Sequence, residues 1–374
     1  MAEKAGSPGT YEFIIQMDPA KKVKLTPTVA PGATVRLEPG PNGTWAVAQE
    51  LGEINMGSPH ALWDFLKWSV SKHPAKRYAL IIAGHGTGIF SFFGPGHVSA
   101  EEPGNVIFDP DRFVALDVTD EDCLTVFEMQ AVLAAFRDRL TGGRPLDMLV
   151  FEACFPGGIE MLVQFRDLVN LVVSSPVEMR MWGLPYSTVA ELLFKNPVTA
   201  DTLLAKEIAE SYVRNAVRIG GSEEAMAVYR TALSDRLAAA IDGLAKALIQ
   251  GFKETGKAPW FTPRYVRSFG PNRAYSDLKE ILNAIINGKC DFRGARNVDE
   301  TRASAKKVLE CLEESHVYSS FSRYLAQEGM GGLSIAWPEH ADYKDVQRFY
   351  KKLDFAKATH WDELLDAWFT APER

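Results

Sequence analysis

Two apolar runs, each ending at a reactive side chain, constrain this chain more than any other feature. The first run, Tyr78–Ala83, is followed by His85, and the second, Leu146–Phe151, is followed by Cys154. Short apolar runs of this kind are typical of buried strands. In an open α/β sheet, side chains that follow neighbouring parallel strands gather at the carboxyl edge. The pattern therefore predicts that His85 and Cys154 meet at one edge of a sheet.

The chemistry of this pair is that of a nucleophile and its base. A thiolate is the reactive form of cysteine, and an adjacent imidazole can take its proton. We expect the helix that opens after Gly158 to favour the thiolate of Cys154 further, through its positive end. The backbone N–H groups of Gly86 and Cys154 are candidate donors to an oxyanion. A plainer explanation stays open for each residue, since cysteine is often a small buried hydrophobe and histidine a satisfied turn residue.

Glu152 precedes the cysteine by two positions. Alternate residues of a strand share one face, so this carboxylate is predicted to point the same way as Cys154. It is a candidate to bind a lysine or arginine of a substrate. The alternative is a helix cap or a surface ion pair.

The first half of the chain alternates between strand and helix patterns. This alternation predicts an α/β fold with a largely parallel central sheet flanked by helices. An early strand and a hairpin-like excursion precede it. The predicted elements are strands Tyr11–Met17, Val23–Val29, Thr34–Leu37, Tyr78–Ala83, Leu146–Phe151 and Leu171–Ser174, and helices from Pro59 to His73, Val126–Leu140 and Ile159–Leu168.

The second half is more helical. We expect residues 1–195 to form the core that carries His85 and Cys154, and residues 196–374 to form an extension packed on it. The predicted helices there are Ser187–Phe194, Thr199–Arg218, Ser234–Phe252, Ser276–Asn287 and Thr301–Glu314, with strands Ala225–Tyr229 and Leu333–Trp337.

Composition excludes several classes of function. The net charge of −7 gives no general basic field for nucleic acid. No apolar run reaches membrane-spanning length, and the N-terminal residues lack the apolar stretch of a signal peptide, so we expect a cytoplasmic protein. None of the four cysteines form a Cys-x-x-Cys pair, which argues against zinc. The glycines around His85 resemble a dinucleotide fingerprint, but no helix pattern follows them.

Several segments, taken together, resemble the clostripain family of cysteine peptidases in the caspase-like clan. The resemblance runs from about residue 50 to the C-terminus. Its motifs are Asn55-Met56-Gly57-Ser58-Pro59, Gly84-His85-Gly86, Glu152-Ala153-Cys154, Gly183-Leu184-Pro185-Tyr186, Ser276-Asp277-Leu278 and the segment from Gly332 to Pro338.

The resemblance implies a caspase–haemoglobinase fold and cysteine endopeptidase activity after Arg or Lys. It also implies self-cleavage between the histidine and cysteine segments. The stretch Thr87–Asp122 reads as a long loop in which Arg112 is the only Lys or Arg, so Arg112 is the expected self-cleavage position. Calcium dependence is known in the family, but the sequence shows no ligand cluster. We therefore expect no metal site and no required cofactor.

The chain departs from the family pattern at three places. Glu152 stands where the family commonly has Asp. Ser175 and Glu178 lie in a segment where the family usually reads Ala-Ser-Glu, and both are candidates to bind substrate. The opening strand with an Asn-x-Asp-Asn-like turn is missing, so we expect a short or replaced first strand.

Two functions from different classes follow. The first is a cytoplasmic cysteine endopeptidase for limited proteolysis of a protein or peptide with a basic residue before the scissile bond. By analogy with bacterial caspase-like peptidases, its role is expected to be activation of an effector protein in a defence system. The alternative is a non-catalytic binding or scaffold protein on the same fold. The presence of both His85 and Cys154 favours the enzyme.

Overall fold

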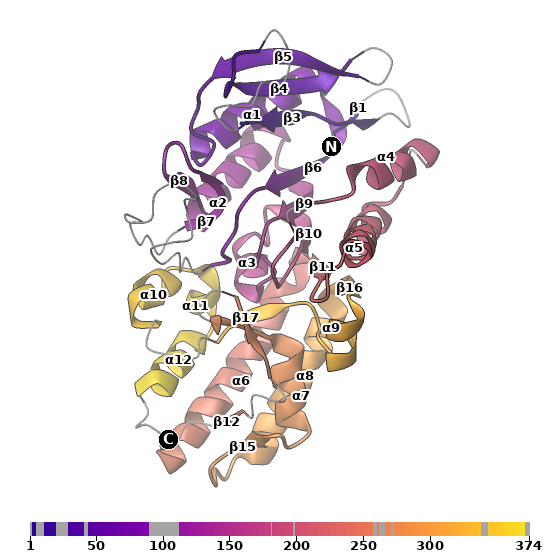
Figure 1. Ribbon diagram of the computed structural model, residues 1–374. Coiled ribbons are helices and arrows are strands. Elements are labelled where there is room, and N and C mark those ends of the chain that lie inside the picture. Colours follow the sequence, from indigo (N-terminus) through magenta and orange to yellow (C-terminus); the bar gives the residue numbers. More distant parts are fainter. Residues whose placement is uncertain are drawn as a thin grey trace.

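The computed structural model describes residues 2–4, 11–19, 29–40, 44–89, 112–180, 182–196, 199–256, 260–261, 266–270, 273–337 and 343–370. Its centre is a seven-stranded sheet in the order β16-β11-β10-β9-β6-β1-β2 (Figure 1). The strands are β1 (Ala2–Lys4), β2 (Tyr11–Glu12), β6 (Ala75–Ala83), β9 (Leu146–Glu152), β10 (Val169–Ser174), β11 (Ala225–Arg230) and β16 (His316–Phe321).

The middle of this sheet is parallel and its edges are antiparallel. β6, β9 and β10 pair in parallel, whereas β1 with β2, β1 with β6, β10 with β11, and β11 with β16 pair antiparallel. Five of the seven strands therefore run the same way, as the predicted α/β fold requires. The first strand, β1, has three residues, which confirms the expectation of a short one.

Helices cover both faces because the side chains of the central strands alternate between two apolar cores. On β9, Met148 and Val150 pack beneath α4 (Tyr186–Lys195) and α5 (Asp201–Arg218). Leu149 and Phe151 belong to the larger core on the opposite face. The helices that contribute to that larger core include α1 (Pro59–Lys72), α2 (Val126–Ala135), α3 (Ile159–Gln164) and α6 (Ser234–Thr255).

The second half adds to the same larger core. A small sheet, in the order β13-β14-β17, packs there with most of the remaining helices (Figure 1). β11 and β16 also lie beyond residue 195, and both belong to the central sheet. The division of the chain into a core of residues 1–195 and an extension of residues 196–374 stays a prediction. The further elements are β12 (Trp260–Phe261), β13 (Ser268–Phe269), β14 (Tyr275–Asp277), β15 (Cys290–Asp291), β17 (Ser334–Ala336), α7 (Leu278–Ile286), α8 (Val298–Ser315), α9 (Arg323–Glu328), α10 (Tyr343–Tyr350), α11 (Asp354–Ala358), α12 (Trp361–Thr370) and the 3₁₀ turn Thr231–Leu233.

Local signals explain where the early helices begin. The Ser58 side chain accepts the N–H of His60 at the start of α1, with proline in the next position. Thr125 and Glu128 form a capping box that opens α2, which continues as a π-helical turn, Phe136–Leu140. The predicted helix Val126–Leu140 is therefore confirmed, with a change of helix type at its end.

Two predictions before α2 are corrected. The stretch expected to be one irregular loop contains a hairpin of β7 (Arg112–Asp117) and β8 (Asp122–Thr125). Near the N-terminus, β3 (Ile15–Met17), β4 (Thr34–Pro39) and β5 (Trp45–Gly52) form a separate sheet, of which β5 was not predicted. The strand expected at Val23–Val29 lies almost wholly outside the described residues.

Candidate active site

The loops that carry His85 and Cys154 are in contact. β6 and β9 are parallel neighbours, with Ala83 opposite Glu152, so both strands end at the same edge. A Cβ atom added to Gly86 would lie 2.7 Å from the carbonyl oxygen of Cys154 and 3.4 Å from its nitrogen. Only glycine allows the two loops to approach this closely. The structure thus brings together the two residues that the sequence singled out.

The histidine loop is supported by the β7–β8 hairpin. The N–H of Ala115 donates to the carbonyl oxygen of His85 at 3.1 Å, and Gly86 pairs with Val114. Ala115 has a φ of 58°, a conformation that side chains rarely adopt. The imidazole itself is exposed. The hairpin therefore holds the backbone of His85 and leaves its ring accessible.

A left-handed turn follows the cysteine. Phe155 has a φ of 68°, which is unusual for a bulky side chain, and such conformations cluster at functional sites. The turn is fixed because Phe155 N–H donates to Val177 O at 3.2 Å and Gly157 N–H donates to Ser175 O at 3.1 Å. The chain reverses sharply at this point, and the side chain of Cys154 stays half-exposed at the end of β9.

The electrostatics of the thiol differ from the expectation. Burial raises the pKa of Cys154, the Met179 N–H that donates to its Sγ at 3.2 Å opposes this, and the charges of Glu178 and Glu224 raise the pKa further. Burial and two negative charges thus act against the thiolate that the sequence pattern was expected to favour. The thiol as it stands is protonated at neutral pH and needs a base.

Glu152 has two partners in the segment that follows β10. Its Oε1 accepts the N–H of Leu184 at 2.9 Å, and the hydroxyl of Tyr186 donates to Oε2. Gly183 has a φ of 62°, and a side chain there would collide with Oε1. Burial and the charge of Glu152 raise the pKa of Tyr186, so its hydroxyl keeps its proton. This carboxylate is therefore held in place by the segment that follows β10, and its orientation toward Cys154 stays a prediction.

The other candidates for substrate binding lie near by but differ in accessibility. Ser175 is fully buried, and its hydroxyl donates to Val177 O at 2.9 Å. This bond stabilises the turn that follows β10. Glu178 is exposed and close enough to Cys154 to raise the pKa of its thiol. Roles for both residues in substrate binding stay predictions.

Arg112 does not lie at a loop tip. It is the first residue of β7 and pairs with Thr125 of β8. A paired strand must open before a peptidase can bind its backbone, because cleavage needs an accessible extended segment. Residues 90–111 lie outside the described residues, and self-cleavage at Arg112 stays a prediction.

Sequence reasoning missed the residues that surround the pair. In the loop after β10, the N–H of Met179 donates to the Sγ of Cys154. In the segment before β11, the charge of Glu224 raises the pKa of the Cys154 thiol, and Glu224 accepts the hydroxyl of Tyr212 from α5. Tyr275, from the second half, contacts the loops that carry His85 and Cys154. Tyr275 and Glu224 are ordinary in the sequence, and only long-range contacts identify them.

Three carboxylates, from Asp18, Glu53 and Asp117, have oxygens within 4.8 Å of one another. No local sequence pattern marks this cluster, because each of the three residues follows or ends a different strand. Oxygen donors of this kind suit calcium. Asp117 already accepts the N–H groups of Met56 and Thr119, both at 2.8 Å. Burial, and then the charge of Asp117, raise the pKa of Asp18, a repulsion that a cation relieves. The donors therefore fit such an ion.

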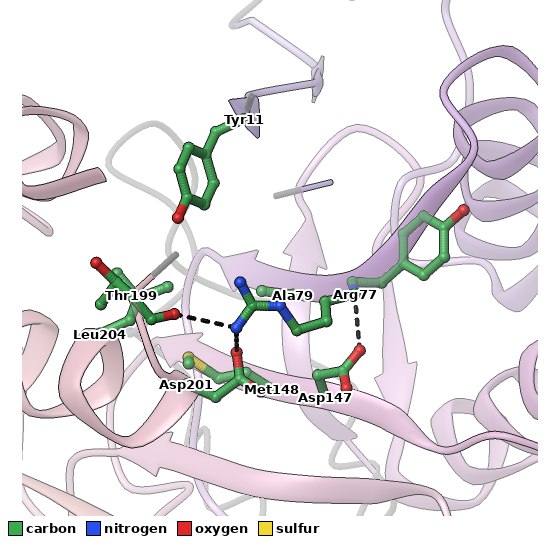
Figure 2. Close-up of a pocket in the computed structure, with 9 residues that line it drawn as sticks. Tyr11, Arg77, Ala79, Asp147, Met148, Thr199, Asp201 and Leu204 are labelled. Carbon is green, nitrogen blue, oxygen red and sulfur yellow. Dashed lines mark hydrogen bonds and ion pairs between the residues drawn. The ribbon is translucent and has the colours of Figure 1, made fainter. Parts of the chain in front are cut away.

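A small cavity lies at the opposite end of the sheet, where β6 and β9 begin. Its lining includes Arg77, whose Nη1 donates to Thr199 O at 3.0 Å and pairs with Asp201 at 2.8 Å (Figure 2). Its volume is about 30 Å³, which is room for about one water molecule. At this cavity Arg77 links β6 to the start of α5, and His85 and Cys154 lie at the other end of the sheet.

Among the described residues, no helix has the length and apolar character to span a membrane.

Comparison with known proteins agrees with the geometry. The model of the clostripain family matches residues 41–368. Clostripain of Hathewaya histolytica is 33% identical over 138 residues, which are 35% of this chain and 23% of that relative. The match therefore spans less than a quarter of the length of the curated relative.

Two solved structures share the fold. One is a secreted C11 cysteine protease from Bacteroides thetaiotaomicron in complex with an irreversible peptide inhibitor. It has a TM-score of 0.63 and 15% identity, and the alignment covers 94% of this chain and 89% of that one. The other is an inactive zymogen C11 protease from Parabacteroides distasonis, with a TM-score of 0.57, 16% identity, and coverage of 87% and 83%. They confirm the caspase-like α/β fold predicted from the sequence.

Proposed function

The chain belongs to the clostripain family, and from this premise we propose that it is a cysteine endopeptidase with His85 and Cys154 as its catalytic dyad. The observation that carries the proposal is the close packing of Gly86 on the backbone of Cys154 at the shared end of β6 and β9. That packing places an exposed imidazole and a half-exposed thiol on touching loops, as nucleophilic catalysis requires.

The reaction follows from these groups. His85 takes the proton of the Cys154 thiol as the sulfur attacks the scissile carbonyl carbon, and the carbonyl electron pair moves to oxygen. The N–H groups of Gly86 and Cys154 stabilise this oxyanion. Collapse breaks the C–N bond, and His85 gives its proton to the leaving amine. A water molecule, deprotonated by His85, then hydrolyses the thioester and restores the thiol.

We further propose that the enzyme prefers Arg or Lys before the scissile bond. Glu152 lies two residues before the nucleophile, and Glu178 is near enough to act on the thiol. The negative charge of a carboxylate attracts a cationic side chain, so these two residues favour Arg or Lys near Cys154. The substrate is then a protein or peptide with a basic residue at that position.

The catalytic steps use only protein groups, so we propose that they require no cofactor. Calcium, if the family trait extends to this chain, fits the oxygens of Asp18, Glu53 and Asp117. Limited proteolysis of an effector protein in bacterial defence is proposed by analogy alone, and a cytoplasmic location stays a prediction. The relative from Bacteroides thetaiotaomicron is described as secreted.

The test compares wild type with Cys154→Ala and His85→Ala on fluorogenic peptides. Loss of a nucleophile or its base typically reduces kcat by ~10⁴-fold or more. Cys123, Cys290 and Cys311 are buried, so an iodoacetamide probe should label Cys154 of the native protein first. A variant without Cys154 that still hydrolyses peptides contradicts the dyad. A wild type that hydrolyses no peptide and whose Cys154 reacts no faster than an ordinary thiol supports the scaffold alternative.

A further inference from the structure

One buried side chain of the second half touches both catalytic loops. Tyr275 lies on β14 and is 1% exposed. Its hydroxyl donates to the carbonyl oxygen of Thr87, two residues after His85, at 2.9 Å. Its ring stacks on Phe155, the residue after Cys154, with ring centroids 6.2 Å apart and planes inclined by 19°.

The space around this tyrosine is closely filled. Gly88 has a φ of 70°, and a Cβ added there would lie 2.5 Å from the Tyr275 hydroxyl oxygen. A Cβ added to Gly270 would lie 2.5 Å from the ring. Two glycines thus allow backbone to pack against opposite parts of the same side chain. The ring has little freedom to move without moving the loop of His85.

The strand beside Tyr275 holds the cysteine loop as well. β14 pairs with β17, with Tyr275 opposite Ala336. On β17, the N–H of Ser334 donates to Gly157 O at 2.8 Å, and its hydroxyl donates to the same oxygen at 3.0 Å. The small sheet is therefore anchored to the chain just beyond Cys154, and Tyr275 extends from it to the loop of His85.

We propose that Tyr275 is a positioning residue for the dyad. The inference rests on the proposed function of His85 and Cys154. Proton transfer between an imidazole and a thiol depends steeply on their separation, and a displacement of about 1 Å can cost ~100-fold in rate. The dyad sits on two different loops, and Tyr275 is one side chain that bonds to one loop and stacks on the other.

The test is Tyr275→Phe, which keeps the stacked ring and removes the hydrogen bond to Thr87. We expect kcat to fall by at least about tenfold with KM within about twofold. The rate of Cys154 alkylation by iodoacetamide should also shift toward higher pH, because His85 is less well placed to accept the proton. A role in stability alone does not move that profile.

Tyr229→Phe is the matched control. Tyr229 is 2% exposed, and its hydroxyl donates to a backbone carbonyl, that of Gly331, at 3.0 Å. The Tyr229→Phe substitution should lower the melting temperature by about as much as Tyr275→Phe does, and it should leave kcat and the pH profile of Cys154 alkylation unchanged. If Tyr275→Phe does not fold, Phe155→Leu removes the stacking from the other side and should shift the alkylation profile in the same direction.

The outcomes separate this inference from the proposed function. Unchanged kcat and an unchanged alkylation profile in Tyr275→Phe, with Cys154→Ala inactive, overturn the role of Tyr275 and keep the dyad. An active Cys154→Ala overturns both. If kcat falls equally in Tyr275→Phe and Tyr229→Phe, the loss comes from lower stability in general, and the role of Tyr275 is also overturned.

Discussion

The backbone N–H of Met179 donates to the Sγ atom of Cys154 at 3.2 Å. The residue after Met179 is fixed in turn by a closed ring of bonds. The N–H of Arg180 donates to the Tyr212 hydroxyl at 3.1 Å, that hydroxyl donates to Glu224 at 2.8 Å, and the Arg180 side chain pairs with Glu224 at 2.9 Å. Since Tyr212 and Glu224 are almost fully buried, the donor to the thiol is held from the protein interior.

Tyr212→Phe should therefore make Cys154 less acidic. The substitution removes the acceptor of the Arg180 N–H and loosens the adjacent Met179 N–H, which opposes the rise in the thiol pKa. We expect the pKa of Cys154 to rise further above its ordinary value. Thiolate absorbance in the ultraviolet, measured as the difference from Cys154→Ala, gives this value. Tyr318→Phe removes another tyrosine hydroxyl, bound to Glu210 at 3.4 Å, and should leave it unchanged. A pKa equal to wild type in Tyr212→Phe contradicts the argument.

Gly86→Ala should separate the two catalytic loops. The added methyl group would lie 2.7 Å from Cys154 O and 2.9 Å from the Cβ of Ala153, so backbone must move. We expect kcat/KM to fall by ~100-fold and the free energy of unfolding to fall by ~1–3 kcal/mol. Kinetics on a fluorogenic peptide, together with denaturant unfolding, check both.

Gly243→Ala is the control for that variant. Gly243 lies within α6 with no atom near its Cβ position, and alanine there should stabilise the helix by up to ~1 kcal/mol without affecting activity. Near-normal turnover in Gly86→Ala would mean that the loops do not need their close contact.

Glu152→Gln should weaken selection for basic residues. Truncating one partner of a desolvated charge pair costs ~2–5 kcal/mol, so kcat/KM should fall far more for an Arg substrate than for an Ala substrate.

Tyr186→Phe should strengthen the preference for Arg over Ala, because the Tyr186 hydroxyl occupies Oε2 of Glu152 and competes with the substrate. A fluorogenic series with Arg, Lys, Ala and Asp measures the preference. Glu191→Gln, on the exposed side of α4, is the matched charge control. Equal Arg and Ala rates in wild type would remove the basis of this prediction.

Glu160→Gln should change the pH dependence of stability. Glu160 is fully buried on α3, and burial raises its pKa from 4.5 to about 7. Between these values the unfolded chain loses the proton while the folded chain keeps it. Wild type therefore loses stability as pH rises from about 4.5 to 7, by on the order of 3 kcal/mol from this group. Gln cannot ionise, although its oxygen can still accept from Ala336 N–H and Tyr350.

Denaturant unfolding of both proteins between pH 4.5 and 8 measures this effect. The difference in unfolding free energy should move in favour of Glu160→Gln as pH rises. Asp277, whose pKa burial raises to about 6, is present in both proteins and cancels in the difference. A difference that stays constant over this range contradicts the assignment.

The strands that precede His85 and Cys154 could be predicted because their signals are local. Unbroken apolar runs define β6 and β9. Because the two strands pair in parallel, both end at the same edge of the sheet. β5 was missed because none of its eight residues is buried, and its sequence, Trp-Ala-Val-Ala-Gln-Glu-Leu-Gly, does not show a clear apolar face. β16 was missed for a similar reason, since all six of its residues are half-buried at the edge of the sheet.

The surroundings of the dyad could not be predicted, because they depend on contacts between distant segments. Tyr275 reaches Thr87 across 188 positions, and Ser334 reaches Gly157 across 177. Neither pairing leaves a local pattern, since a buried tyrosine or serine looks the same wherever it packs. The predicted helix Ser276–Asn287 shows this directly, because its first two residues belong to β14 and only the rest form α7.

The anchoring of both catalytic loops by β14 and β17 sets an order of events during synthesis. His85 and Cys154 leave the ribosome well before Tyr275 and Ser334, so a growing chain carries its reactive pair without the side chains that fix it. We expect the nascent chain to remain inactive until β17 has emerged. Stalled chains in which residues 334–336 lie inside the ribosomal exit tunnel or beyond it can be assayed for peptide hydrolysis, and activity with these residues still inside the tunnel would contradict this order.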